Sequence, residues 1–168
     1  LRDLRSGRTL HVFDAKSADG LDPTTVAFID HDQAILRCSA ETGLSRIRFT
    51  DQADGSMKCS EPEVLSAETD WQMTDTSADR RRFALTAVDG SKVRIVELTD
   101  TGLREVARWD YPSAYSASFN PAADAVLVNG NGNPEARLRV FSVTKGKVLA
   151  ELPAEAFGDG VWSANGRM

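Results

Sequence analysis

Short apolar runs, each stopped by a turn after a few residues, form the dominant pattern along the chain. The stretch 115–153 shows this best, with runs at 116–119, 125–129, 137–143 and 147–152. β-Branched and aromatic residues fill these runs, and Gly, Asn, Asp or Pro bounds each one, as is typical of strands joined by tight turns. Apolar residues do not recur at the three- and four-residue spacing of a helix. The pattern therefore predicts antiparallel strands and excludes a helical fold.

The run 138–143 shows the two-residue alternation of a strand. In LRVFSV, Leu138 and Val140 face one way, while Arg139 and Phe141 face the other. KVRIVEL, at 92–98, alternates in the same way. Because apolar groups occur on both faces, we expect each sheet to lie between two neighbours.

The pattern repeats along the chain. In each repeated segment a bulky apolar residue lies just before the turn that joins the first and second strands. These residues are Phe28, Met73, Phe119 and Trp162, with spacings of 45, 46 and 43 residues. Glycines in the turn before each fourth strand are spaced by 48, 47 and 44 residues, at Gly7, Gly55, Gly102 and Gly146. Glycines between the second and third strands follow at Gly43, Gly90 and Gly132. These markers predict a repeat of about 45 residues.

Three whole units are predicted, at 25–66, 70–110 and 115–153. Residues 1–14 supply the end of a preceding unit, and residues 157–168 begin a further one. The pairs Asp89-Gly90 and Asn129-Gly130 predict tight turns with positive φ angles. The stretches 15–23 and 60–70 are expected to be irregular surface connections.

A four-stranded unit of this length resembles the WD-repeat β-propeller blade. The stretch 117–128 is similar to the first turn of that family, and 138–152 to its third strand, turn and fourth strand. Phe141 and Ser142 stand where the family often has Trp-Asp, and no unit of this sequence carries that pair at the end of its third strand. The buried hydrogen-bond network of the family is therefore not transferred to any residue here. The resemblance implies an all-β fold of antiparallel meander blades, three of them whole, with partial blades at both ends.

The resemblance also implies further blades. Propellers close with about four to eight blades, and ragged ends leave unpaired strand edges. We expect the remaining blades in the same parent chain or in another chain.

Composition and charge narrow the classes of partner. Hydrophobic residues make up 41% and charged residues 27% of the chain, as in ordinary globular proteins, and the Ala-, Asp- and Arg-rich composition resembles that of bacterial proteins. A net charge of −5 disfavours a nucleic-acid partner, and no apolar run has the length of about 18 residues that a membrane helix needs. Cys38 and Cys59 fall on strands too far apart for a disulfide, which favours a cytoplasmic location.

Candidate catalytic and metal-binding motifs are sparse. The only histidines are His11 and His31, too few to support a Ser-His-Asp triad, and His31 sits between two aspartates that cannot easily converge on one ion with it. The segment 129–134 lacks the lysine of a phosphate loop and the spaced acids of a calcium loop. The basic run at 79–82 is interpreted as a charged turn. We expect no catalytic residue, no cofactor and no metal.

Three aromatic residues at unit junctions are the candidate partner-binding residues: Trp71, Tyr111 and Tyr115. Loops lie on the surface, and aromatic side chains there can anchor a partner. Packing between adjacent blades is the structural alternative for the same residues.

These observations favour a non-catalytic propeller scaffold for protein–protein interaction or ligand sensing, within a larger signalling or regulatory protein. The alternative is a gating propeller domain of a serine peptidase or hydrolase whose active site lies in another domain. A Gly-x-Ser-x-Gly elbow in flanking sequence would favour that alternative.

Overall fold

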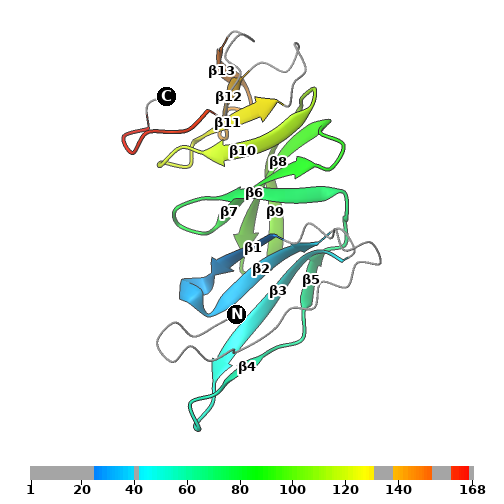
Figure 1. Cartoon of the computed structure of the whole chain (residues 1–168), viewed down its shortest axis with the longest axis vertical. Coiled ribbons are helices and arrows are strands. Elements are labelled where there is room, and N and C mark those ends of the chain that lie inside the picture. Colours follow the sequence, from blue (N-terminus) through cyan, green and yellow to red (C-terminus); the bar gives the residue numbers. More distant parts are fainter. Residues whose placement is uncertain (1–24, 40–41, 131–137, 153–159, 167–168) are drawn as a thin grey trace. The chain divides into compact units, whose positions relative to one another are not determined.

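The computed structural model describes residues 25–39, 42–130, 138–152 and 160–166. They fall into two compact units, Leu1–Thr69 and Asp70–Met168 (Figure 1). Each unit is described by itself. The predicted partial blade at 1–14 and residues 157–159 of the one predicted at 157–168 lie outside the described residues.

The first unit contains one antiparallel sheet. Its strands are β1 (Thr25–Ile29), β2 (Ala34–Ser39), β3 (Gly43–Asp51), β4 (Met57–Cys59) and β5 (Glu63–Ser66). Strands β4 and β5 both pair with β3, β4 along its end and β5 along its beginning. The two short strands thus share the place of one fourth strand, and Pro62 lies between them. The expectation of an irregular connection over 60–70 is wrong for β5.

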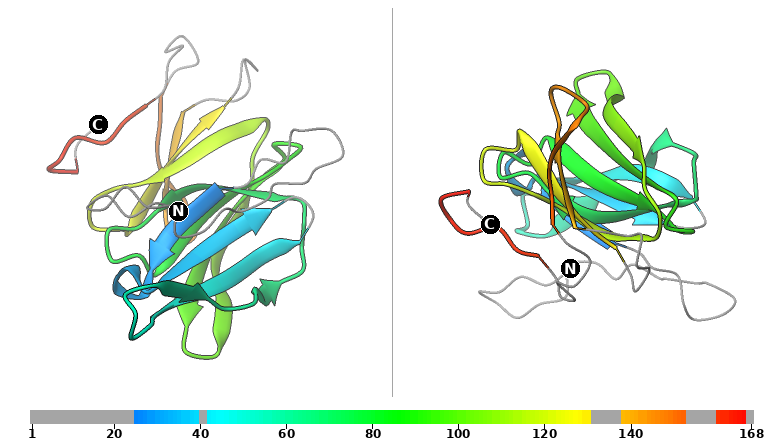
Figure 2. Two further views of the ribbon diagram at one scale, coloured as in Figure 1. Left: turned by 60° about the horizontal axis from the view of Figure 1, so that its bottom comes forward. Right: turned by 90° about the horizontal axis from the view of Figure 1, so that it is seen from above.

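The second unit contains two four-stranded antiparallel sheets in simple sequence order. The middle sheet comprises β6 (Trp71–Thr76), β7 (Arg82–Ala87), β8 (Lys92–Thr99) and β9 (Gly102–Asp110). The last sheet comprises β10 (Ala114–Phe119), β11 (Ala125–Gly130), β12 (Arg139–Ser142) and β13 (Val148–Glu151). Each sheet has the strong twist visible in Figure 2. The predicted all-β fold of four-stranded meanders is confirmed.

Apolar packing joins the middle and last sheets. Ala84 and Ile95 of the middle sheet and Val126 of the last sheet are fully buried in one cluster. Within this cluster the ring centroids of Trp109 and Phe141 lie 4.8 Å apart. The other face of the last sheet packs separately, through Ala125, Leu127 and Val140 against Trp162. The last sheet is therefore covered on both faces, as the alternation in the sequence predicts.

Side chains of β6 form hydrogen bonds to the backbone of β10. The Thr74 hydroxyl donates to the Ala117 carbonyl at 3.0 Å and accepts the Ala117 N–H at 3.2 Å. The Asp75 carboxylate accepts the Phe119 N–H at 2.7 Å. These backbone groups lie on the edge of β10 opposite β11, because backbone groups alternate between the two sides of a strand. Thr74 and Asp75 therefore take the place of a neighbouring strand.

The apolar marker of the middle sheet was assigned to the wrong residue. In the first and last sheets, Phe28 faces Ile35 and Phe119 faces Val126 across the first turn, and the two residues of each pair are seven positions apart. In the middle sheet, the pair with this separation is Thr76 and Phe83. Met73 pairs with Leu85, three positions further from the turn along β6. Thr76, not Met73, thus holds the repeated position.

The turn glycines agree with the sequence analysis at Gly90, but not at Gly130. Gly90 has a φ of 72°, as predicted, whereas Asp89 is not among the residues with positive φ. Asn129 and Gly130 lie within β11, opposite Ser116 and Ala114. The prediction of a tight turn at Asn129-Gly130 is therefore wrong, because the strand continues through both residues.

Replacing Thr74 with valine removes the hydroxyl while keeping the shape of the side chain. We expect the exchange of the Ala117 amide hydrogen to become about tenfold faster, since its N–H loses an acceptor worth about 1–2 kcal/mol. Native-state hydrogen exchange measures the change. Thr50→Val, at an exposed position of β3, is the control. Unchanged protection of Ala117 in Thr74→Val would contradict the bridging role of this hydroxyl.

Candidate functional site

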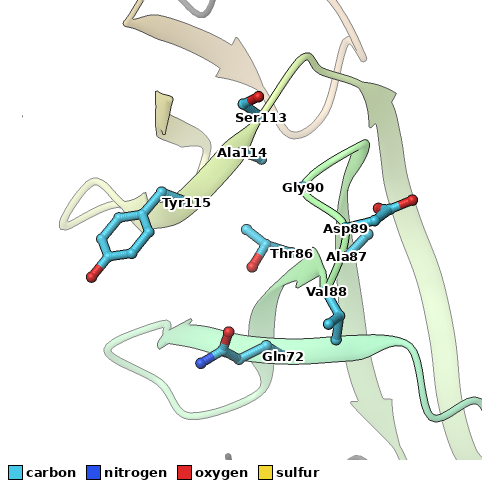
Figure 3. A pocket seen from close by; sticks show the side chains of 9 residues that line it. All are labelled: Gln72, Thr86, Ala87, Val88, Asp89, Gly90, Ser113, Ala114 and Tyr115. Carbon is cyan, nitrogen blue, oxygen red and sulfur yellow. The ribbon is translucent and has the colours of Figure 1, made fainter. Parts of the chain in front are cut away.

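A depression of about 230 Å³ lies where the β7–β8 turn meets the beginning of β10 (Figure 3). Three segments of the second unit form it: the start of β6, the end of β7 with its turn, and the start of β10. The lining residues are Gln72, Thr86, Ala87, Val88, Asp89, Gly90, Ser113, Ala114 and Tyr115.

The β7–β8 turn is fixed by two local hydrogen bonds. The Gly90 N–H donates to the Ala87 carbonyl at 2.8 Å. The Asp89 carboxylate accepts the Ser91 N–H at 2.9 Å, and this bond lowers the pKa of Asp89 below its usual range. Asp89 is therefore ionised at neutral pH, and Figure 3 shows its side chain directed away from Gln72 and Thr86.

The turn approaches β10 so closely that a side chain at position 90 would press on the β10 backbone. The Ala114 N–H donates to the Gly90 carbonyl at 2.7 Å. A Cβ at Gly90 would lie 3.1 Å from Ser113 Cα and 3.2 Å from Ala114 N. Ser113 itself has a φ of 59°. This backbone contact holds the two walls of the depression together.

A β-bulge places Tyr115 at the rim. Ala114 pairs with Gly130 and Ser116 with Asn129, so that Tyr115 is the extra residue of β10. Bulges redirect a side chain and are frequent near functional sites. Tyr115 is 62% exposed, as is Val88 on the turn. The rim thus presents an aromatic and an aliphatic side chain to solvent.

Neutral polar groups lie deeper in the depression. Thr86 is only 2% exposed, and Figure 3 shows its side chain between Gln72 and the turn. Gln72 is half-buried on β6, directly opposite Thr86 in the strand register. Within the described part of the chain, no other residue makes a side-chain hydrogen bond to Gln72, Thr86 or Ser113. These groups are therefore available to a ligand.

Of the three predicted partner-binding aromatic residues, only Tyr115 lines the depression. Trp71 is 7% exposed, because the guanidinium groups of Arg94 and Arg108 lie 5.1 Å and 5.5 Å from its ring centroid. Partner binding by Trp71 stays a prediction, and the two arginines that cover its ring belong to its own sheet.

Tyr111 is likewise buried, at 2% exposure. Its ring contacts Phe141 edge-on at 6.3 Å, and the Arg139 guanidinium lies 5.5 Å from the ring centroid. Burial raises the pKa of the Tyr111 hydroxyl. Partner binding by Tyr111 stays a prediction as well.

The other motifs are not among the residues that line the depression. Asp30–Asp32 forms the short 3-10 helix η1, in which His31 has a φ of 56° and is exposed. His11 and most of the segment 129–134 lie outside the described residues. Where the structure describes the chain, no group of three or more His, Cys, Asp and Glu residues is placed to hold a metal ion. The same residues include no helix long and apolar enough to cross a membrane. Cys38 and Cys59 are free thiols.

Sequence reasoning missed Gln72, Thr86 and Ser113 as site residues. In RFALTA, Thr86 continues an apolar strand and gives no functional signal. Gln72 and Ser113 meet it only because the turn and the bulge bring their segments together.

Comparison with family models and with curated protein sequences finds no match. Among solved structures, the chain is similar to the β-propeller domain of Cps50 (Swd1) from Myceliophteria thermophila, with a TM-score of 0.56, 13% identity, and coverage of 78% of this chain and 43% of that one. It is also similar to a candidate 6-phosphogluconolactonase from Bacteroides fragilis, with a TM-score of 0.55, 12% identity, and coverage of 91% and 48%. The chain spans less than half the length of either. Together with the sheets, these similarities show that the chain forms β-propeller blades.

Replacing Gly90 with alanine tests the close approach at the depression. Gly146→Ala is the matched control, because Gly146 has a φ of 64° with open space around its Cβ position. Both variants incur about 1–2 kcal/mol for a left-handed alanine. We expect Gly90→Ala to lose about 1–3 kcal/mol more, since the added methyl group overlaps the backbone of β10. Denaturant unfolding measures both, and equal losses would contradict the role assigned to Gly90.

Proposed function

We propose that this chain is a non-catalytic propeller scaffold that binds a protein partner through the rim of the depression. The supporting observation is Tyr115, an aromatic residue that a β-bulge holds exposed beside the equally exposed Val88. Tyrosine is enriched among the residues that dominate binding energy at protein interfaces. A rim that exposes an aromatic and an aliphatic side chain is better suited to contact with a protein partner than to contact with water.

The chemistry of the lining supports binding over catalysis. Asp89 is the only carboxylate among the lining residues, which include no histidine, cysteine or lysine. A general acid or base must be directed toward the reacting group, and Asp89 is directed away from Gln72 and Thr86. The volume of about 230 Å³ is also below the roughly 300–1,000 Å³ typical of cofactor and small-molecule sites.

In this proposal the chain is part of a larger regulatory assembly. The remaining blades come from the same parent chain or from another chain, because the chain spans less than half of each propeller to which it is similar. Propeller folds host scaffolds and enzymes alike, so the proposal rests on the site and not on the fold.

Site-specific photocrosslinking tests the proposal in the intact protein. A benzophenone amino acid at position 115 should give light-dependent adducts with one protein, identified by mass spectrometry. The control places the same group at Leu149, which is 52% exposed on β13. Adducts of equal yield at both positions would contradict a partner site at the rim.

The identified partner then allows an affinity measurement. We expect Tyr115→Ala to weaken binding about 10- to 30-fold, or about 1.4–2 kcal/mol, because it removes the exposed ring without disturbing the buried core. Leu149→Ala should change the affinity less than about twofold. An unchanged affinity of Tyr115→Ala would contradict the proposed interface.

A further inference from the structure

One face of β1, in the first unit, is exposed at positions that are buried in the last sheet. Val26 and Phe28 lie on the same face of β1, because they are two residues apart, and they are 51% and 42% exposed. By strand register, the same positions of β10 hold Ala117 and Phe119. These two residues are only 0% and 8% exposed. The first strand of the last sheet therefore has a cover that β1 lacks.

The middle sheet shows what this cover consists of. β10 lies beside β6 and β7, the first two strands of the middle sheet. Ala117 and Phe119 belong to an apolar cluster that also contains Ala84 of β7. The Thr74 hydroxyl of β6 accepts the Ala117 N–H, and the Asp75 carboxylate accepts the Phe119 N–H. The opening hairpin of one sheet thus covers both the face and the backbone edge of the first strand in the next.

The backbone edge of β1 is open at the corresponding positions. The N–H groups of Val26 and Phe28 point away from β2, by the same register that directs those of Ala117 and Phe119 away from β11. Among the described residues, no side chain forms a hydrogen bond to the Val26 or Phe28 N–H. Single exposed apolar residues are ordinary on a protein surface. Two of them beside an open strand edge form a surface to which another segment can add.

Only one kind of segment matches both features of this surface. A strand that adds to the edge would pair with the N–H groups but would leave the side chains of Val26 and Phe28 exposed. A helix would cover these side chains, but its own backbone groups are already bonded within it, so that it does not extend the hydrogen bonding of the edge. A hairpin laid on the face satisfies both, as β6 and β7 do for β10.

We propose that β1 docks the opening β-hairpin of a further propeller blade, supplied by the parent chain. The first strand of that hairpin presents a hydroxyl to the Val26 N–H and a carboxylate to the Phe28 N–H, in the places of Thr74 and Asp75. Its second strand packs on the exposed face of β1. The inference rests on the further blades included in the proposed function, and it is independent of the rim at Tyr115.

A hairpin taken from this chain serves as the probe. The peptide comprises residues 71–87, closed into a ring by an Asn-Gly turn between the paired ends Ala87 and Trp71, because an open two-stranded hairpin is only marginally stable. We expect it to bind the 168-residue chain and to slow the amide exchange of Val26 and Phe28 at least about tenfold, measured by NMR. The amides of β13 should not change.

A second peptide tests the polar contacts. It carries Thr74→Val and Asp75→Ala, so that both acceptors are lost while the hairpin is kept. We expect it to bind about tenfold more weakly than the first peptide. Equal binding of the two peptides, or no binding of either, would overturn the proposal.

Variants of the chain locate the apolar contact. Phe28→Ser should weaken binding of the first peptide at least about tenfold, because it removes a large apolar side chain from the docking face. Val64→Ser is the matched control, since Val64 is 58% exposed on β5, and it should change the affinity less than about twofold. Should Phe28→Ser fail to fold, Val26→Thr replaces it, with an expected loss of about threefold.

The remaining outcomes also decide the matter. Slowed exchange of the Val26 and Phe28 amides that does not depend on either side chain would show a strand added at the edge, and would reject the hairpin. A dimer in sedimentation, with both amides protected before any peptide is added, would assign the surface to a second copy of this chain. Photocrosslinking at position 115 is unaffected by these results, so that the rim and the docking surface on β1 fail separately.

Discussion

The fold depends on how one blade satisfies the exposed backbone edge of the next. A four-stranded meander has a first strand with one open edge, and an unpaired edge exposes polar groups that must find partners. In the second unit, Thr74 and Asp75 of β6 supply these partners to β10. These bonds join residues that are 43 and 44 positions apart in the sequence, which is close to the repeat length read from the sequence. Apolar packing adds buried surface area between the two sheets, whereas these hydrogen bonds fix how their first strands, β6 and β10, align.

The same alignment creates the depression. Once β10 is fixed beside β6, the β7–β8 turn meets the start of β10, and the short bond from Ala114 to Gly90 locks that contact. The backbone of the turn lies so close to β10 that a Cβ at position 90 would be in tight contact with Ser113 and Ala114, and the depression lies beside this contact. The bulge at Tyr115 then turns one aromatic ring outward. The site is thus a consequence of blade stacking and of one extra residue in β10.

The sequence was sufficient for the fold and insufficient for the site. Strand alternation and turn glycines predict the meanders, because hydrophobic period and positive φ are local properties. Bulges are not local in this sense: neither the one between Met73 and Asp75 nor the one at Tyr115 gives a signal in the sequence. Thr86 escaped notice for a related reason. Thr86 lines the depression only because segments distant in the sequence come together there, and no periodicity in the sequence indicates this.

The last sheet shows how the contact between neighbouring first strands can be made by different residues while the fold stays the same. By strand register, Ser118 occupies the position of Asp75, since each is one residue before the position that closes the first turn. Its hydroxyl is buried and has no hydrogen-bond partner among the described residues, whereas the Trp162 indole N–H donates to the Ser118 carbonyl at 3.0 Å. The contact with the following segment is therefore kept, but an indole and a backbone carbonyl replace the carboxylate. The edge strand of such a repeat can therefore be satisfied by a carboxylate in one sheet and by an indole N–H and a backbone carbonyl in the next.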